Sequence, residues 1–546
     1  MNSSLDSARD ERPRWFISTL TCVLLAGCAT TPEPVKELPK DAAQIPTEQL
    51  AELVAKPAPS APVPYKPLPA VEPMKVVLLP VPNKPIVSVR LVFRTGSVDD
   101  PSGKEGLTAL TTRVLLEGGT KSLDSAQLQE ALYPMAAELE GDTDKEFTTI
   151  TGRVHRDRLA RFLEILGEAL LAPRFEEKEF TRLRSEQLNA IKNRLRQEND
   201  EELSKVALDA LLYEGHPYRH FTGGTEAGLT ALTLDDVKSQ WRNTFTQDRL
   251  IIGLAGGVDA ALATQVKTTL SALPPTGVKR ADLPTAPGPQ QLTLIIERDT
   301  TSTAGDFGFT TPLRRDAPDF LPLFIAMSYF GEHRQEHGVL YQEVRERRGL
   351  NYGTYAYAQH YRQDGWQSVP RPNILRSQQD VTFWLRPVKP DKAVFATRAV
   401  VHFLEQLRSQ PIPKEQFETA RGFLAGATRI WTTTDQQKLG WAIDELIAGT
   451  PDFLGSVRKT LETITPEQAQ AAVKKYVSPG SLNFVFVTRD AAGLAGALKS
   501  GEPSPITYTS PKAEDVTRDD ALIAKEALPI APEHLRIVKA SEVMAR

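Results

Sequence analysis

The sequence predicts an α+β protein made of two copies of one α/β unit, each about 200–230 residues long. The repeat is clearest where the two copies end. Residues 232–255 align without a gap on residues 464–487, at an offset of 232 positions, and both stretches read as a helix, a turn and an apolar strand. Upstream, residues 162–164 match residues 403–405 at a slightly different offset, as loop insertions would produce.

Strand and helix patterns alternate through the first copy. Two strands open it, at residues 74–81 and 86–93, with a turn at Pro82-Asn-Lys-Pro85 between them. Apolar periodicity then predicts, in order, a helix after Gly106, a helix over 125–139, a strand over 147–154, and helices over 156–171 and 176–196.

Composition sets the remaining boundaries. The Pro-rich residues 281–289 are predicted to link a first domain, 74–280, to a second domain, 290–500. Residues 501–546 show few periodic apolar positions, so this tail is expected to pack along the surface or to remain mobile.

The N-terminus reads as a targeting segment. Three arginines precede an apolar run over 15–26, which is too short to span a membrane and is typical of a signal peptide. The run ends in Leu25-Ala-Gly-Cys28, which resembles a bacterial lipobox, so residues 1–27 would be removed and Cys28 lipidated. Ala29 after this cysteine favours the outer membrane of a bacterial cell envelope, facing the periplasm. A chance cysteine at the end of an apolar run is the alternative.

Residues 28–73 are rich in Pro, Ala, Glu and Lys and read as a semi-extended tether. The other cysteine, Cys22, lies inside the predicted signal peptide, so the mature chain would have no disulfide bond. The formal net charge of −4 argues against nucleic acid as a partner.

A helix-to-strand segment in the second copy carries the first functional signal. A short helix is predicted from Gly338, with Gly349 as its left-handed cap and a strand over 350–357. Three arginines crowd the last turn of the helix: Arg345, Arg347 and Arg348. The segment is either a basic helix end followed by an edge strand, or a binding site in which Arg345 and Tyr352 together contact a peptide carbonyl.

This segment resembles the second-domain signature of the insulinase/pitrilysin metallopeptidases, which include the subunits of mitochondrial processing peptidase. Arg345, the Gly-Leu pair and Tyr352, seven residues after the arginine, match the family spacing. The resemblance covers residues 74–500. It implies that the two copies form a clamshell around a peptide, as in processing-peptidase-like metallopeptidases, and that Arg345 and Tyr352 bind substrate.

Active members of this family carry an inverted zinc motif, His-x-x-Glu-His, on the first helix of the first half. Residues 106–120 keep the frame of that motif but not its chemistry. The first histidine position holds Ala109, the general-base position Thr112 and the second histidine position Arg113, and Ala190 stands where the last glutamate ligand is expected. The resemblance therefore implies a member without catalytic residues and without a zinc of its own.

One stretch spells the motif elsewhere: His333-Arg-Gln-Glu-His337. Gly331 and Gly338 bracket it, so it reads as a loop, whereas the motif requires one helix to present both histidines on the same face. A zinc site at His333, Glu336 and His337 is therefore the weaker alternative.

Three functions follow. The first is the substrate-binding subunit of a heteromeric zinc metallopeptidase, whose zinc belongs to a homologous partner chain and whose substrate is a peptide or an unfolded protein. The second is an autonomous zinc peptidase that uses His333, Glu336 and His337. The third is a non-enzymatic, lipid-anchored peptide-binding or scaffold protein.

Overall fold

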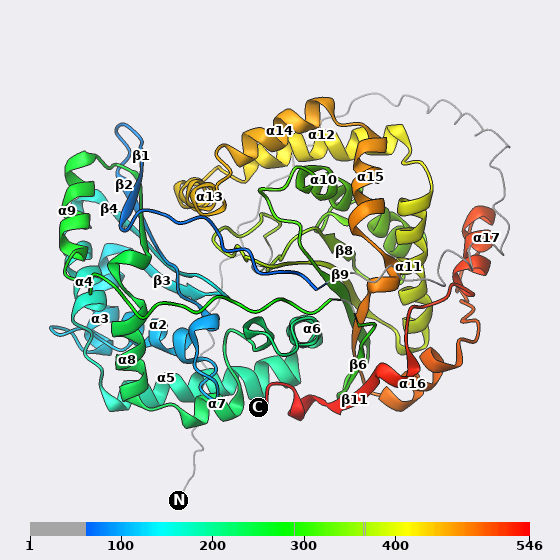
Figure 1. Ribbon diagram of the computed structural model, residues 1–546, viewed down its shortest axis with the longest axis horizontal. Helices are drawn as coiled ribbons and strands as arrows, with labels where there is room; N and C mark the ends of the chain where they lie inside the picture. The colour runs from blue at the N-terminus through cyan, green and yellow to red at the C-terminus, as the bar shows by residue number, and fades with distance from the viewer. Residues whose placement is uncertain (1–61, 289, 364, 366) are drawn as a thin grey trace, which may run out of the picture. The chain divides into compact units, whose positions relative to one another are not determined.

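The computed structural model of the protein describes residues 62–288, 290–363, 365 and 367–546. The predicted signal peptide, the predicted lipidation residue Cys28 and most of the predicted tether lie outside these residues. The described chain forms two α/β halves, each built on one sheet (Figure 1).

The first half is built on a five-stranded sheet in the order β1-β5-β2-β4-β3. Its strands are β1 (Lys75–Pro80), β2 (Ile86–Phe93), β3 (Glu138–Thr143), β4 (Thr148–His155) and β5 (Leu250–Gly256). Its helices are α2 (Leu107–Glu117), α3 (Ser125–Leu132), α4 (Leu159–Leu171), α5 (Glu177–Asn189), α6 (Asp200–Leu212), α7 (Glu226–Ala231), α8 (Leu234–Thr244) and α9 (Ala260–Leu270). A π-helical stretch, Ala190–Glu198, continues α5.

The second half is built on a six-stranded sheet in the order β11-β6-β10-β7-β9-β8. Its strands are β6 (Thr293–Glu297), β7 (Thr303–Thr311), β8 (Thr354–Tyr357), β9 (Gln379–Val388), β10 (Asn483–Thr488) and β11 (Leu535–Lys539). Its helices are α10 (Phe320–Gly331), α11 (Ala393–Ser409), α12 (Lys414–Ile430), α13 (Asp435–Ala448), α14 (Phe453–Thr463), α15 (Pro466–Tyr476), α16 (Ala491–Ser500) and α17 (Glu514–Ile523).

The two sheets share one strand order, and this confirms the predicted repeat. The second sheet has one extra strand, β11, at its edge. Its other five strands correspond in order to those of the first sheet: β6 to β1, β10 to β5, β7 to β2, β9 to β4 and β8 to β3. Shifting α8 by 232 residues gives the bounds of α15. Both helices begin at a threonine, Thr233 or Thr465, whose side chain accepts a hydrogen bond from the first turn in a capping box.

One helix of each half packs on the sheet of the other half. Helix α6 of the first half packs on β7 and β10, whereas α13, its counterpart in the repeat, packs on β5 and β2 (Figure 1). Leu203 and Leu208 of α6 therefore share a core with Val485, and Ile443 of α13 shares one with Ile251. Separating the halves would expose these side chains to water, at roughly 1.5–3 kcal/mol each.

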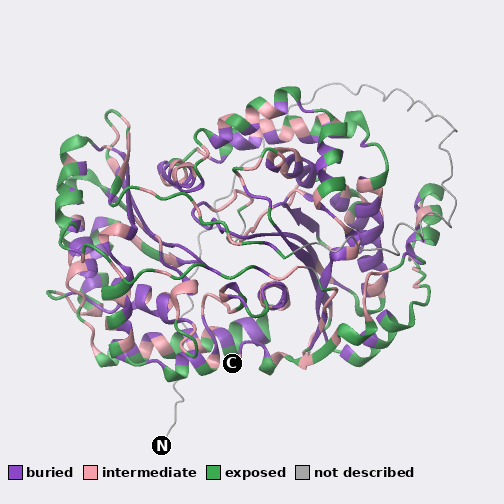
Figure 2. Ribbon diagram, in the orientation of Figure 1, coloured by how far each residue is buried: buried purple, intermediate pink, exposed green. Residues whose placement is uncertain are grey.

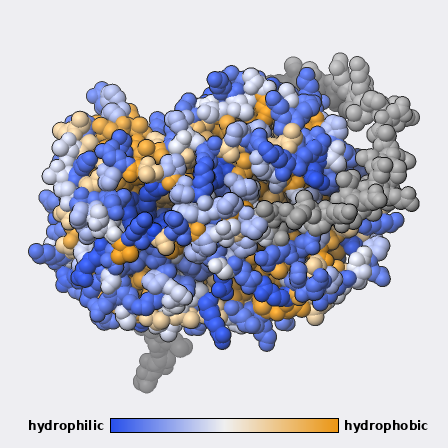
Figure 3. Space-filling view, viewed as in Figure 1, coloured by the Kyte–Doolittle hydropathy of each residue, from blue (hydrophilic) through white to orange (hydrophobic). Residues whose placement is uncertain are grey.

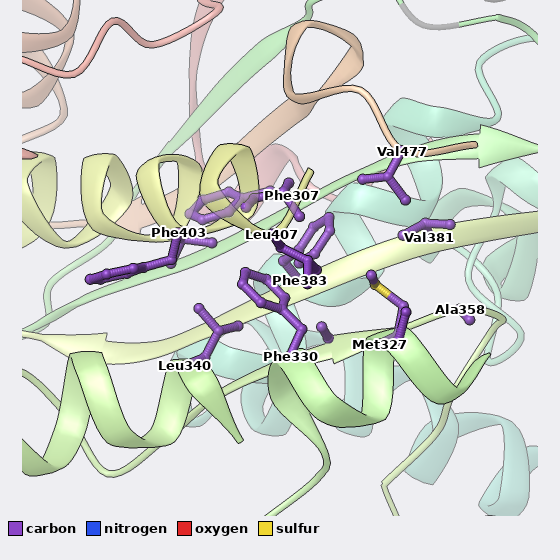
Figure 4. Packing of buried hydrophobic residues seen from close by; sticks show 14 of the residues in the cluster. Phe307, Met327, Phe330, Leu340, Ala358, Val381, Phe383, Phe403, Leu407 and Val477 are labelled. Carbon is purple, nitrogen blue, oxygen red and sulfur yellow. The ribbon is translucent and has the colours of Figure 1, made fainter. Parts of the chain in front are cut away.

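The core of the second half lies between its sheet and its helices. Helix α10 is apolar on nearly all sides and buried, as expected of a helix covered all round. Its Met327 and Phe330 meet Phe383 of β9, with Phe403 and Leu407 of α11 close by (Figure 4). Buried residues line the sheets and the inner helix faces (Figure 2), while hydrophilic residues dominate the face shown in Figure 3. Within the described residues, no helix is both long and apolar enough to cross a membrane.

One helix prediction was wrong at its end. The helix predicted over 125–139 stops at Leu132, and residues 138–143 instead form the edge strand β3. Pro134 explains the stop, because proline cannot donate the main-chain hydrogen bond that the helix would need there. Ala136, with a φ of 45°, then turns the chain toward β3.

Residues 62–73, assigned to the tether from their composition, are packed against both halves. Val63 pairs with Ala286 of the predicted linker and is buried. Arg94 of the first half donates to the carbonyl of Pro69 at 2.8 Å, and Arg314 of the second half donates to that of Lys66 at 2.6 Å. An extended Pro-rich chain leaves its carbonyls unpaired, so side chains from both halves bind it.

The tail after Gly501 packs on the protein, one of the two expectations for it, and also supplies elements that its composition did not predict. Strand β11 extends the second sheet by pairing in parallel with β6. Beyond β11 the chain reaches the first half, where the amide of Glu226 donates to the carbonyl of Met544 at 2.8 Å. The tail therefore ties the two halves together.

Candidate functional site

The first candidate site lies on α2, where the backbone frame of the inverted zinc motif is intact. Gly106 caps the helix with a φ of 100°, and a Cβ on it would lie 2.8 Å from the carbonyl oxygen of Gly223. This close approach requires glycine. The carboxylate of Asp100 accepts hydrogen bonds from the amides of Gly106 and Thr108 at 2.8 and 2.7 Å, so the start of the helix is fixed.

Arg113, at the second histidine position, is the centre of a charged cluster. It donates two hydrogen bonds to Glu117, at 2.9 and 3.0 Å, and one to Glu186 of α5, at 2.7 Å. It also donates to the carbonyl of Leu183 at 3.1 Å. The guanidinium therefore links α2 to α5, the helix that would bring the last zinc ligand.

Protonation equilibria in this cluster favour the ion pairs. The Arg113 guanidinium holds the pKa of Glu186 below its usual range. Burial opposes the charge on Arg113, but the hydrogen bonds that it donates to Glu117 and Glu186 outweigh it and raise the pKa of Arg113. Both shifts favour the ion pair between Arg113 and Glu186.

The residues present do not fit a zinc ion. Ala109 and Ala190 offer no ligand atom. Thr112 is buried, and its hydroxyl donates to the carbonyl of Thr108 at 2.9 Å and lies 3.1 Å from the hydroxyl of Thr143. Zinc needs imidazole, thiolate or carboxylate ligands, and the fixed positive charge of Arg113 stands in the motif instead.

The second candidate site is the segment around Arg345 and Tyr352. The helix predicted from Gly338 becomes a π-helical stretch, Tyr341–Glu346, and Gly349 adopts the predicted left-handed conformation with a φ of 62°. The predicted strand begins later, at Thr354, because the side chain of Asn351 accepts from the amide of Gly353 at 3.1 Å and holds a turn.

Arg345 and Tyr352 lie together, as predicted from their spacing. Arg345 donates to the main-chain carbonyl of Tyr352 at 3.1 Å, and its guanidinium lies 4.5 Å from the ring centre of Tyr341 and 5.9 Å from that of Tyr352. The side chain of Tyr352 is 77% exposed. The pair is thus held in one place with the phenol open to solvent. Among the described residues, no hydrogen bond or ion pair joins it to α2.

The neighbouring arginines have other partners. Arg348 is fully buried and donates to Glu343 at 2.7 Å and to Asp520 of α17 at 2.8 Å. Arg347 pairs with Glu343 and Asp515 at the surface. These two arginines therefore anchor the C-terminal tail, a role that only the folded tail reveals.

The second spelling of the zinc motif lies in a loop, as its flanking glycines predicted. His333 is buried, with its Nδ1 2.6 Å from the hydroxyl of Tyr357, whereas His337 packs against Phe423. In the described part of the chain, the one group of metal-ligand side chains that converges is a different one: Asp209, His360 and Asp380.

That group was missed from the sequence, because its members come from α6, the β8–β9 loop and β9, far apart along the chain. Arg376 fills it. The guanidinium lies 3.1 Å from Asp209, 3.4 Å from Asp380 and 3.0 Å from Nε2 of His360. A cavity of about 80 Å³ adjoins this group between the halves. Buried in its wall, Lys145 has its pKa lowered to about 8 by loss of solvent.

A larger groove, of about 1020 Å³, lies between α6, the β6–β11 edge and the C-terminal residues. His216 and Glu105 line it on the first half, and Val543 and Met544 of the tail close one side. No sequence pattern predicted this groove, since it is formed where the tail crosses between the halves.

Two repeated α/β halves, with the frame of an inverted zinc motif on the first helix but no ligands in it, define a metallopeptidase-like protein that lacks the usual metal site. Comparisons with known proteins give the family. The model for insulinase (peptidase family M16) matches residues 75–222, and that for the peptidase M16 inactive domain matches residues 231–424. The chain belongs to the insulinase family, peptidase family M16.

The chain is 22% identical to a non-peptidase homologue, YmxG, of Helicobacter pylori over 415 residues, which cover 74% of this chain and 89% of the relative. It is 23% identical to the beta subunit of the mitochondrial-processing peptidase of Dictyostelium discoideum over 185 residues, or 33% of this chain and 39% of that one.

Among solved structures, the peptidase M16 inactive domain from Pseudomonas fluorescens matches with a TM-score of 0.67 and 20% identity, covering 77% of this chain and 97% of the other. A protease from Helicobacter pylori matches with a TM-score of 0.64 and 16% identity, covering 78% of this chain and all of the other (100%). These structures share the fold.

Proposed function

We propose that this chain is the non-catalytic, substrate-binding subunit of a heteromeric zinc metallopeptidase that acts on peptides or unfolded proteins. The observation that carries the proposal is the bridge from Arg113 to Glu117 and Glu186, which puts a permanent cation in the motif that holds zinc in active relatives. The zinc that activates water would then be bound by a partner chain, a homologue with the intact inverted zinc motif.

In this proposal, Arg345 and Tyr352 bind and orient the peptide substrate. Binding and orienting a peptide contributes to rate independently of the metal that activates water. A guanidinium and a phenol can both donate hydrogen bonds to a peptide carbonyl. Arg345 donates to the main-chain carbonyl of Tyr352, and its guanidinium lies 5.9 Å from the centre of the Tyr352 ring, so the guanidinium needs little ordering when a peptide arrives.

The test is reconstitution with a zinc-bearing homologue encoded beside this chain. We expect the two chains to elute together on sizing, to hold about one zinc per pair, and to cleave an unfolded peptide that this chain alone leaves intact. Cleavage by this chain alone would overturn the proposal. Peptide binding without assembly with the homologue would instead favour the second candidate.

That second candidate is a non-enzymatic peptide-binding or scaffold lipoprotein. It is favoured by the Helicobacter pylori relative, whose name describes it as a non-peptidase homologue. The autonomous peptidase predicted from His333, Glu336 and His337 has no support in the described residues, because the two histidines pack against different aromatic side chains.

We also propose that the chain is anchored by lipid at Cys28, to the outer membrane on its periplasmic side. The support is the sequence Leu25-Ala-Gly-Cys28 and the Ala29 that follows. Cys28→Ser is expected to leave the chain unlipidated and to release it from the membrane fraction. An unmodified N-terminus upstream of Cys28 in the wild-type protein, found by mass spectrometry, would contradict the anchor.

A further inference from the structure

A lysine of the first half is held by an aromatic cluster of the second. The ammonium nitrogen of Lys205, on α6, lies 3.7 Å from the ring centre of Trp384, on β9. An ammonium at this distance over an indole is attracted by the charge distribution of the ring. Five side chains make up what we call the aromatic box: His333, Tyr355, Tyr357, Tyr361 and Trp384.

The rings of the box are packed against one another. The ring centres of Tyr357 and Trp384 are 4.4 Å apart, and Tyr361 stacks on Tyr357 at the same distance of 4.4 Å. His333 lies 4.6 Å from Tyr355 and 5.1 Å from Tyr361. Because β8, β9, the loop between them and the loop after α10 fix these rings, the box is preorganised and needs no rearrangement to receive a cation.

Charge around the box favours a cation within it. His333 is buried, which lowers its pKa to about 3, so the box carries no positive charge of its own near neutral pH. The adjoining cavity of about 80 Å³, which Lys205 and Trp384 also line, carries both charges. Its carboxylates are Asp144, Glu202, Asp209 and Asp380, and its cations besides Lys205 are Lys145, Arg362 and Arg376, so the formal charges balance only when a cation stands at the position of Lys205.

Two buried polar atoms, one in the box and one in a residue that lines the cavity, lack hydrogen-bond partners among the described residues: Nε2 of His333 and Oδ1 of Asp380. Both residues are about 1% exposed. A buried carboxylate oxygen without a donor is costly, and Oδ1 of Asp380 is satisfied when a donor reaches it. An ammonium entering from the cavity would carry three N–H donors into this neighbourhood.

Lys205 is not sealed into the core. It is half-buried and borders the cavity, whereas Trp384, the ring that it covers, is buried. A flexible lysine side chain can therefore leave the box through the cavity while the rings stay in place.

We propose that the aromatic box is a recognition subsite for a lysine side chain of the bound peptide, and that Lys205 occupies it as an intramolecular substitute when no peptide is present. The proposal rests on the proposed function, since it specifies which peptides this subunit would prefer.

The box is tested directly with n-butylammonium, the side-chain cation of lysine on its own, by calorimetric titration of the purified full chain. Lys205→Ala empties the box and is expected to bind n-butylammonium roughly tenfold more tightly than the wild type. Lys205→Arg keeps a cation in the box and should resemble the wild type. Lys205→Ala combined with Trp384→Leu should lose the gain.

Equal binding by Lys205→Ala and the double variant would overturn the proposal, because the ring of Trp384 would then contribute nothing. Circular dichroism checks that each variant folds. Should Lys205→Ala fail to fold, Lys205→Gln, which keeps most of the side-chain volume without the charge, is tested against the same prediction.

A second measurement separates this proposal from the proposed function. An unfolded peptide with one lysine is compared with the same peptide carrying norleucine, and tighter binding of the lysine peptide is expected, most of all in Lys205→Ala. Equal binding of both peptides would overturn the subsite and leave the subunit function intact. Binding of neither peptide would count against the subunit function, and the n-butylammonium titration would then decide the box alone.

Discussion

Nη2 of Arg113 donates to Oε2 of Glu186 at 2.7 Å and so joins α2 to α5. Arg376 does the same at the group formed by Asp209, His360 and Asp380. At both places a guanidinium supplies positive charge among residues of metal-ligand type. An arginine stays charged at any physiological pH and needs no supply of metal, so these contacts are permanent features of the fold.

The first prediction concerns metal content. The isolated chain, prepared without a metal-binding tag, should carry well under one equivalent of zinc, because Ala109, Thr112, Arg113 and Ala190 supply no zinc ligand. Atomic absorption or inductively coupled plasma mass spectrometry measures this. Stoichiometric zinc that disappears in His333→Ala or His337→Ala would show that the loop motif is a metal site after all.

The second prediction concerns Arg345 and Tyr352 in the reconstituted complex. Tyr352→Phe and Arg345→Ala should each lower turnover of an unfolded peptide by about a hundredfold, the usual effect of removing one hydrogen-bond donor to a developing charge. Assembly should be unchanged, since neither side chain is in the core. Arg347→Ala is the matched control and should do much less. Equal turnover in all three variants, with assembly preserved, would reduce the segment to a basic helix end.

The third prediction separates two adjacent arginines by their burial. Arg348→Met removes the fully buried guanidinium that pairs with Glu343 and with the buried Asp520, and it should lower the free energy of unfolding by about 3–5 kcal/mol. Arg347→Met breaks a surface pair and should cost less than about 1 kcal/mol. Urea unfolding measures both. Similar losses in the two variants would mean that the tail is not anchored through Arg348.

The fourth prediction is a dependence of stability on pH. Burial raises the pKa of Asp306, on β7 beneath Ser204, from 3.8 to about 7. Between these values the folded state holds a proton that the unfolded state has released, so stability is lost as pH rises toward 7. Asp306→Asn removes this loss. Its stability relative to the wild type should therefore increase by about 2 kcal/mol between pH 5 and pH 8.

Urea unfolding at several pH values measures this difference. The matched control is Asp299→Asn, whose side chain is 91% exposed and whose variant should track the wild type at every pH. Parallel pH curves for Asp306→Asn and the wild type would show that Asp306 is ionised in the folded protein at little cost.

Much of the architecture could be predicted from local patterns. The offset of 232 residues reproduced the bounds of α8 in α15, because the same capping threonine and the same apolar spacing start and hold both helices. The left-handed conformation of Gly349 followed from its place after a helix end. The helix over 125–139 was predicted too long because the apolar spacing was weighted above Pro134, which ends the helix.

The candidate site, like the fold, could be predicted from the sequence only in part. That the zinc ligands are missing is readable from single positions, and the association of Arg345 with Tyr352 follows from a separation of seven residues. The group of Asp209, His360 and Asp380, the aromatic box and the tail groove could not be predicted, because each joins residues from segments far apart along the chain.

The sequence by itself determined that this protein is a twofold repeat of an α/β unit, that the first unit has Ala109, Thr112 and Arg113 at the positions of the zinc motif, and that the second has the Arg345–Tyr352 pair. These features depend on local spacing and residue type, which one stretch of chain specifies. Only the tertiary structure decided that α6 and α13 cross to the opposite sheets, that Glu186 meets Arg113 and that Lys205 enters the aromatic box. Such contacts arise when apolar faces from distant segments are buried together, and periodicity within one segment cannot say which faces will meet.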